Sequence, residues 1–296
     1  MNRIMQEVIY YNEDCLTGME RIDAGSIDCI LTDPPYLYLK NQKLDRPFDE
    51  TLFFSKAKRI LKDNGFIVIF GRGTSFYRWN TILADLGFQF KEEVIWDKGF
   101  STSPLMPVSR VHESISICTK KNGIINKVKV PYLERKKHDI DGIITDIKRM
   151  KAILKNTKSL DAVLNFLENN KVNYERKHTD KFASSYHKNS FKSANVESCS
   201  MRAIRDGMNE STIIREYRER YTSIHPTQKP VRLLERLLTL VTKPGDLVLD
   251  PFAGSASTAI ACMNLQRKFI GYEIDNEYYE ASKERIKNHQ SLSNKE

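Results

Sequence analysis

Two short motifs, one near each end of the 296-residue chain, contain residues that could bind and position a ligand for reaction. The first, Asp33-Pro34-Pro35-Tyr36, directly follows the apolar run Ile27–Thr32. A carboxylate at a strand end lies where α/β folds bind ligands. Proline has a fixed φ and no N–H, so the carbonyl groups here can face a donor rigidly, and the tyrosine ring offers a face for stacking. The set suits a planar amine; taken alone, it also fits a stiff turn.

The second motif is a glycine turn, Asp250-Pro251-Phe252-Ala253-Gly254-Ser255-Ala256-Ser257, between a predicted strand and a predicted helix. α/β folds approach nucleotide-like ligands with such a strand, turn and helix N-terminus. Glu273 stands 19 residues after Gly254, near the spacing expected for an acid that binds ribose hydroxyls. The sequence lacks GxGxxG, which disfavours a dinucleotide.

Alternating strands and helices would position both motifs. Apolar runs predict strands at Val8–Tyr11, Ile27–Thr32, Phe66–Phe70, Val94–Trp96, Ser114–Cys118, Leu247–Leu249 and Phe269–Tyr272. Helical periodicity predicts helices at Leu52–Leu61, Phe76–Leu86, Val231–Val241, Ser255–Leu265 and Asn276–Ile286. This order predicts an α/β fold with a mostly parallel sheet, helices on both faces, and both motif loops at one edge.

The positive charge of the chain is concentrated in its middle third. Residues 121–222 hold 22 Lys and Arg against 13 Asp and Glu, whereas the rest of the chain is neutral. Two amphipathic helices are predicted there, over residues 143–154 and 160–167, followed by aromatic residues interleaved with basic ones over 174–195. A segment of this kind is typical of binding to a polyanion. A solvated loop with a few packing aromatics is the alternative.

Composition bears on location and on metal binding. No apolar run approaches the roughly 18 to 20 residues that cross a membrane, and the N-terminus does not resemble a signal peptide, so we expect a cytoplasmic protein. The five cysteines are scattered and contain no CxxC pair, and the six histidines form no HxxxH cluster. We therefore expect neither a disulfide framework nor a metal site.

Together with His225-Pro226-Thr227-Gln228-Lys229-Pro230, the two motifs closely resemble the amino-methyltransferases of DNA, which act on adenine N6 or cytosine N4. The motif order is that of the permuted beta group, with Asp-Pro-Pro-Tyr before the cofactor loop. The resemblance covers residues 8–120 and 224–289 and includes Trp96-Asp97-Lys98. It implies a Rossmann-like S-adenosylmethionine-dependent methyltransferase domain made of residues 1–120 and 223–296, with an inserted target-recognition region at 121–222.

The resemblance also implies roles for individual residues. The catalytic set would be Asp33, Pro34, Pro35 and Tyr36: the carboxylate and the Pro34 carbonyl would accept hydrogen bonds from the target amine, and the ring would stack on the flipped base. S-adenosylmethionine would be bound by Asp14, Thr227, Lys229, Asp250, Phe252, Gly254, Ser255 and Glu273. The chain departs from the family's Phe-x-Gly-x-Gly loop in having Ala256 at the second glycine.

The function that the resemblance implies is site-specific methylation of adenine N6 in double-stranded DNA, by direct in-line transfer to a flipped base. It further implies a cognate restriction endonuclease as a partner, and a homodimer. An acid at position 33 is usual for adenine enzymes of the family, whereas serine is more usual for those acting on cytosine N4. Cytosine-N4 methylation, RNA methylation and an inactive cofactor-binding DNA regulator remain as alternatives.

Overall fold

The chain forms two compact units. In the computed structural model, the residues described are 7–36, 45–100, 107–139, 141–143, 145–146, 199–218 and 223–293. The first unit comprises Met1–Asn126 and Ser211–Glu296, and the second comprises Lys127–Glu210.

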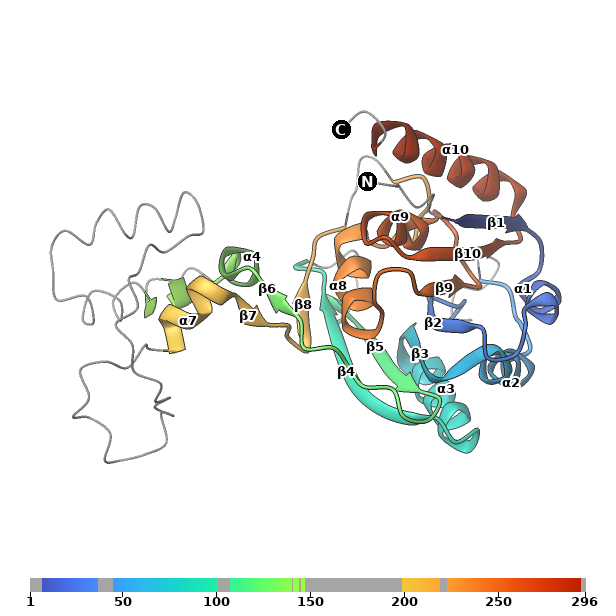
Figure 1. The fold of residues 1–296 in the computed structure, drawn as a ribbon, viewed down its shortest axis with the longest axis horizontal. Helices are drawn as coiled ribbons and strands as arrows, with labels where there is room; N and C mark the ends of the chain where they lie inside the picture. The colour runs from blue at the N-terminus through green and yellow to red at the C-terminus, as the bar shows by residue number, and fades with distance from the viewer. Residues whose placement is uncertain are drawn as a thin grey trace, which may run out of the picture. The chain divides into compact units, whose positions relative to one another are not determined.

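An eight-stranded sheet forms the centre of the first unit (Figure 1). Its strands, in spatial order, are β1 (Val8–Asn12), β10 (Lys268–Glu273), β9 (Leu247–Asp250), β2 (Ile27–Thr32), β3 (Leu61–Gly71), β5 (His112–Thr119), β4 (Gln89–Asp97) and β8 (Ile213–Arg215). Five of the seven neighbouring pairs are parallel, and β5 runs antiparallel to both of its neighbours. The prediction of a mostly parallel sheet is therefore confirmed.

Two groups of helices cover the two faces of this sheet (Figure 1). The helices on one face are α1 (Cys15–Gly18), α2 (Glu50–Ile60) and α3 (Gly73–Asp85), with the short 3₁₀ helix η1 (Met19–Arg21). Those on the other face are α8 (Val231–Val241), α9 (Ser257–Asn264) and α10 (Asn276–Ser293). With both faces covered, neighbouring residues of β2 such as Cys29 and Ile30 are both fully buried. That is why the central strands are continuous apolar runs in the sequence.

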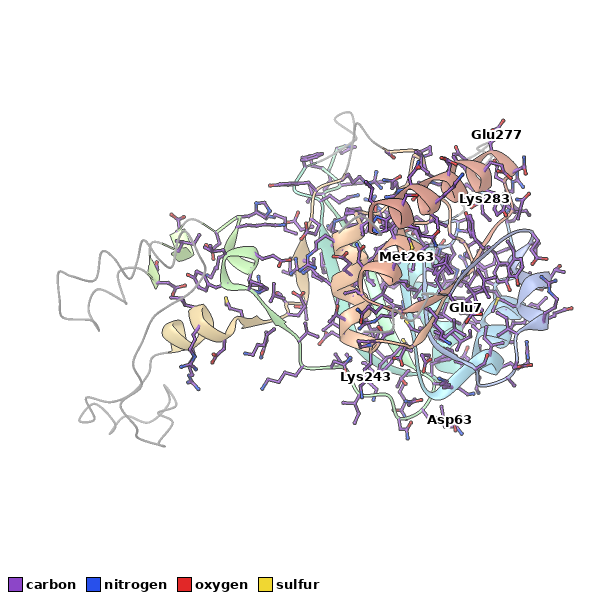
Figure 2. All side chains as sticks on the ribbon, turned by 45° about the horizontal axis from the view of Figure 1, so that its top comes forward. Glu7, Asp63, Lys243, Met263, Glu277 and Lys283 are labelled. Carbon is purple, nitrogen blue, oxygen red and sulfur yellow. The ribbon has the colours of Figure 1, made fainter. Side chains whose placement is uncertain are left out.

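The helices α9 and α10 differ in how much of their surface is exposed. On α10, Glu277 and Lys283 are exposed, whereas Ser282 between them is buried. On α9, every residue from Ser257 to Met263 is buried (Figure 2 labels Glu277, Lys283 and Met263). Among the described residues, the structure contains no helix that is sufficiently long and apolar to span a bilayer.

The edge strand β8 is not among the strands predicted from the sequence. It pairs in parallel with β4, with Ile95, Trp96 and Asp97 opposite residues 213–215, and Ile214 is fully buried. β8 also lies inside the predicted inserted region, 121–222, but outside the second unit, Lys127–Glu210. The predicted region begins before that unit and ends after it. A strand of three residues within a charged stretch gives too short a pattern to recognise, and only its pairing partner defines it.

The second unit contains a small antiparallel pair, β6 (Lys129–Val130) and β7 (Met208–Asn209). Its described helices include α4 (Tyr132–Lys136) and α7 (Cys199–Asp206). The ring of Tyr132 is buried, and its hydroxyl donates to Asp146 Oδ2 at 2.5 Å. Most of the helix predicted over 143–154, the whole helix over 160–167, and the aromatic and basic stretch 174–195 lie outside the described residues.

Candidate active site

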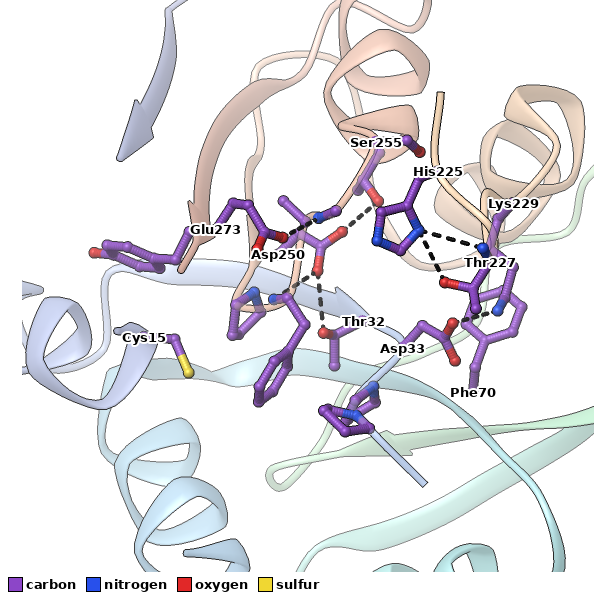
Figure 3. Close-up of a pocket in the computed structure, with 18 of the residues that line it drawn as sticks. Cys15, Thr32, Asp33, Phe70, His225, Thr227, Lys229, Asp250, Ser255 and Glu273 are labelled. Carbon is purple, nitrogen blue, oxygen red and sulfur yellow. Dashed lines mark hydrogen bonds and ion pairs between the residues drawn. The ribbon is translucent and has the colours of Figure 1, made fainter. Parts of the chain in front are cut away.

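Both motif loops open into one cavity of about 260 Å³ in the first unit. Asp33 follows β2 and Asp250 ends β9, and these two strands are parallel neighbours, so both loops leave the same edge of the sheet. Every residue predicted for the site lines this cavity: Asp14, Asp33, Pro34, Pro35, Tyr36, Thr227, Lys229, Asp250, Phe252, Gly254, Ser255 and Glu273. Figure 3 shows part of this lining, with Asp33 beside Lys229 and Asp250 beside Thr32.

The Asp33–Tyr36 loop is held by bonds within itself and to α3. The hydroxyl of Tyr36 donates to Asp33 Oδ1 at 2.5 Å, and the Tyr36 carbonyl accepts a hydrogen bond from the Ser75 hydroxyl at 2.6 Å. The Tyr36 ring lies 5.9 Å from that of Trp79. The side chain of Asp33 is 21% exposed, so its carboxylate is accessible from the cavity. A target amine could thus reach an acceptor whose orientation is already fixed.

Lys229 is buried beside this loop. Its Nζ donates to Asp33 Oδ2 and lies 3.3 Å from Glu113 Oε2. The Nζ also lies 5.0 Å from the centre of the Phe70 ring. The Lys229 side chain is only 7% exposed, so little water reaches it. Burial alone would lower the pKa of Lys229, but the two carboxylates outweigh burial and raise it above its ordinary value. Lys229 is therefore a charged donor that fixes the second oxygen of Asp33.

Glu113 is a site residue that belongs to none of the sequence motifs. Glu113 lies in β5, and its Oε1 is 3.2 Å from Lys98 Nζ and 3.6 Å from Arg218 Nη2. Burial favours the neutral form of this carboxyl, yet the three cations around it hold its pKa well below its usual range. The available signal was an acid next to the apolar run 114–118, which by itself also fits an exposed strand end.

Asp250 holds the glycine turn together. Its Oδ1 accepts hydrogen bonds from the Thr32 hydroxyl at 3.0 Å and the Phe252 N–H at 3.2 Å, and its Oδ2 accepts one from the Thr258 hydroxyl at 2.6 Å. The residue is 4% exposed, and burial raises its pKa to about 7. Both oxygens accept hydrogen bonds from within the protein, so Asp250 holds the turn in shape; its direct contact with the cofactor stays a prediction from the resemblance.

Glu273 connects the end of β10 to the same turn. Its Oε2 accepts the Gly254 N–H at 3.0 Å and its Oε1 accepts the Asp275 N–H at 2.7 Å. Gly254 has φ +50°, a conformation that favours glycine, and its carbonyl accepts a hydrogen bond from the Ser282 hydroxyl at 2.6 Å. Burial raises the pKa of Glu273. Each oxygen of Glu273 retains capacity for a further hydrogen bond, such as one from a hydroxyl.

The departure at Ala256 has a conformational consequence. Ala256 adopts φ +55° and ψ +29°, the left-handed region, and it is fully buried at the start of α9. A residue with a Cβ is strained there by roughly 1–2 kcal/mol. The position thus keeps the backbone conformation of a glycine while carrying a methyl group.

His225 lines the cavity as a neutral ring. Its Nδ1 accepts a hydrogen bond from the Thr227 N–H at 3.3 Å and lies 3.1 Å from the Thr227 hydroxyl, and its ring packs edge-on against Tyr278. Burial, followed by the nearby charge of Lys229, lowers the pKa of His225 to about 4. It therefore orders the turn that carries Thr227 and Lys229. Among the described residues, no group of three or more His, Cys, Asp or Glu side chains could hold a metal ion.

Comparison with known proteins assigns this arrangement to a family. The model of the N6/N4 methyltransferase family, described as DNA methylase, matches residues 27–284. The chain belongs to this family. It is accordingly a DNA amino-methyltransferase that uses S-adenosylmethionine, as the motifs predicted.

Curated relatives of this DNA methylase resemble it over nearly its whole length. It is 25% identical over 282 residues to the type II methyltransferase M.HpaI of Haemophilus parainfluenzae, covering 92% of this chain and 72% of the relative. It is 24% identical to the type II methyltransferase M2.DpnII of Streptococcus pneumoniae, covering 95% and 90% of the two chains.

Solved structures share the fold of the methylase. The M1.HpyAVI–SAM complex aligns with a TM-score of 0.53 at 20% identity, covering 94% of this chain and 99% of that one. The PvuII DNA methyltransferase, which is cytosine-N4-specific, aligns with a TM-score of 0.57 at 16% identity, covering 96% and 92%. The predicted Rossmann-like methyltransferase fold is confirmed.

The cavity of the methylase fits S-adenosylmethionine. Glu273 at the end of β10 and Asp14 just after β1 carry carboxylates that can accept hydrogen bonds from hydroxyl groups. Phe252 and Phe48, with ring centres 5.1 Å apart, supply an apolar wall. Lys229 supplies a cation for a carboxylate. These chemical types match the ribose, the adenine ring and the amino-acid end of the cofactor.

Proposed function

We propose that this DNA methylase modifies N6 of adenine. The observation that carries the proposal is the carboxylate of Asp33, held at the end of β2 by Tyr36 and Lys229 and accessible from the cavity. A carboxylate is a stronger acceptor for an amine hydrogen than the serine hydroxyl more usual in cytosine-N4 enzymes of the family. An acid at this position is the usual choice of the adenine enzymes.

The residues around the target amine would prepare it for reaction. The amino nitrogen of adenine is conjugated with its ring and is a poor nucleophile. Asp33 and the Pro34 carbonyl, by accepting its two hydrogens, would favour a pyramidal nitrogen with an available lone pair. Pro35 would keep the loop rigid, and the ring of Tyr36 would stack on the flipped base. Asp33 is also placed to accept the proton that the amine loses.

S-adenosylmethionine, when bound, supplies a methyl group carried on a sulfonium. We propose that Phe252, Gly254 and Ser255 line its site, with Asp250 holding their loop in shape. In the same proposal Glu273 binds the ribose and Asp14 lies near the adenosine. Thr227 and Lys229 contact the methionine end, using the donor capacity of Lys229 that remains after its contacts with Asp33 and Glu113.

The proposal includes a role for the second unit and the macromolecules that the enzyme would act with. We propose that the unit Lys127–Glu210, which contains most of the charge excess, recognises the target sequence in double-stranded DNA. Two relatives are type II methyltransferases, and their names support a role beside a cognate restriction endonuclease. Assembly as a homodimer stays a prediction from the resemblance.

Cytosine N4 is the second candidate target, because the PvuII enzyme, which is specific for it, shares the fold. The deciding experiment treats unmethylated DNA with the enzyme and S-adenosylmethionine, digests it to nucleosides and identifies the product by mass spectrometry. We expect N6-methyladenine. N4-methylcytosine without N6-methyladenine would overturn the adenine assignment and leave the enzyme class intact.

A further inference from the structure

A row of buried charges continues from Asp33 into the interior of the first unit. Lys229 Nζ contacts Asp33 on one side and Glu113 Oε2, at 3.3 Å, on the other. Glu113 Oε1 faces Lys98 Nζ at 3.2 Å. The side chains of Lys229, Glu113 and Lys98 are only 7%, 6% and 4% exposed. Charges so well shielded from water interact strongly, so each one restricts the position of the next.

Glu113 is placed to act on Asp33 through Lys229. Its Oε2 makes no hydrogen bond with any described residue, and it forms an ion pair with the ammonium of Lys229. The Lys229 ammonium lies 5.0 Å from the Phe70 ring centre and 5.7 Å from that of Trp96. Between these rings and two carboxylates, the ammonium has one favourable position. Without the charge of Glu113, the ammonium would still be attracted to Asp33 but would lose the second contact that fixes its position.

We propose that Glu113 is a positioning residue for methyl transfer: as a second anchor it fixes the position of Lys229 beside Asp33, so that the Asp33 carboxylate keeps one orientation toward the target amine. The inference rests on the proposed role of Asp33 at the amine. It does not depend on whether that amine belongs to adenine or to cytosine.

The proposal predicts a specific change in pH dependence. The charged and titratable groups around Lys229 and its partner Glu113 come from five elements or their ends: Asp33 after β2, Glu113 in β5, Lys98 after β4, Arg218 after β8 and His225 before α8. Burial lowers the pKa of Lys229, and Asp33 and Glu113 raise it. Neutralising Glu113 must therefore lower this pKa. Lys229 then loses its charge, and its hold on Asp33, at a lower pH.

The test compares kcat over pH 6–10 for the wild type and Glu113→Gln, a shape-preserving substitution. We expect kcat at neutral pH to fall about 10-fold or more, with KM for DNA changed less than about threefold. Because the wild-type pKa of Lys229 lies above its ordinary value, wild-type kcat should show no alkaline loss up to pH 10, whereas the alkaline limb of Glu113→Gln should move down into this range. The matched control is Glu216→Gln, a buried carboxylate 3.0 Å from Arg236, which should leave the alkaline limb in place.

A second variant, Glu113→Asp, separates charge from position and remains informative if Glu113→Gln does not fold. It keeps the charge and shortens the side chain by one methylene, so kcat should fall while the alkaline limb stays unchanged. Wild-type kcat in either variant would overturn the proposal. So would a loss of kcat in Glu113→Gln with no displacement of the limb, as for a purely structural residue. High activity of Asp33→Ala would instead refute the role of Asp33, and nucleoside analysis tests the base separately.

Discussion

Lys229 contacts Asp33 although 196 positions separate the two residues in the chain. Asp33 follows β2, and Lys229 lies just before α8, so this ion pair joins a motif from the N-terminal part of the chain to one from the C-terminal part. Tyr36 donates to the other oxygen of Asp33. Both oxygens of the proposed amine acceptor are therefore fixed by neighbours.

Replacing Asp33 by alanine should abolish most methyl transfer while leaving the protein folded. The substitution removes an acceptor at the reacting amine, a loss of about 100-fold or more in kcat. Lys229 would keep Glu113 as a partner, so its charge would not be stranded. Turnover and thermal melting should be measured side by side; near-normal turnover would refute the assignment.

Two substitutions separate the ring of Tyr36 from its hydroxyl. The sequence alone predicts a mild effect of Tyr36→Phe, because stacking needs only the ring. The structure adds a 2.5 Å hydrogen bond to Asp33, so we expect kcat to fall about 10-fold. Tyr36→Ala should lose considerably more. Equal kcat values for the two variants would show that the ring does not stack on the base.

The methyl group of Ala256 should have little net effect on stability. Ala256→Gly relieves strain of about 1–2 kcal/mol, but it also removes a buried methyl worth about 0.8 kcal/mol and increases the entropy of the unfolded chain. We expect the free energy of unfolding to change by less than about 1 kcal/mol in chemical denaturation. A branched side chain in Ala256→Val should cost about 3 kcal/mol or more. A tolerated valine would contradict the left-handed, buried geometry.

Acid should weaken the fold through His225. Its pKa in the folded protein, about 4, lies below its ordinary value of 6.5, so the unfolded chain takes up the proton first. The contribution of the neutral His225 ring to the free energy of unfolding is fully present above pH 6.5 and is lost as the pH falls toward 4. Between pH 7 and pH 4.5, His225→Asn should lose about 2 kcal/mol less unfolding free energy than the wild type. Equal losses would show that the ring is not neutral through burial.

Neutralising Arg176, Lys177 and Lys181, which lie outside the described residues, tests the recognition region. Alanine at these positions should weaken DNA binding and reduce the slope of log K against log salt by roughly 0.9 per lost phosphate contact. Affinity for S-adenosylmethionine should not change. Lys283→Ala with Lys287→Ala, both exposed on α10, is the control for general charge. A salt slope equal to that of the control would contradict DNA contact by this stretch.

The sequence by itself determined the elements and the motifs. The strand at Ile27–Thr32 and the helix at Val231–Val241 have the predicted bounds, because apolar periodicity is a local property of the chain. The gathering of Asp33 and Gly254 at one edge could also be predicted. Their loops follow parallel strands, and such strands place their carboxyl ends together.

Only the tertiary structure decided which charges meet inside the site and how the backbone bends there. Glu113 could have been an exposed strand end, but the position of β5 beside β3 places its carboxylate against Lys229. Likewise, β8 is a strand because β4 offers it an edge, and Ala256 is left-handed because the turn into α9 requires it. These features depend on partners far along the chain, and no local pattern of residues encodes the distance between two buried charges.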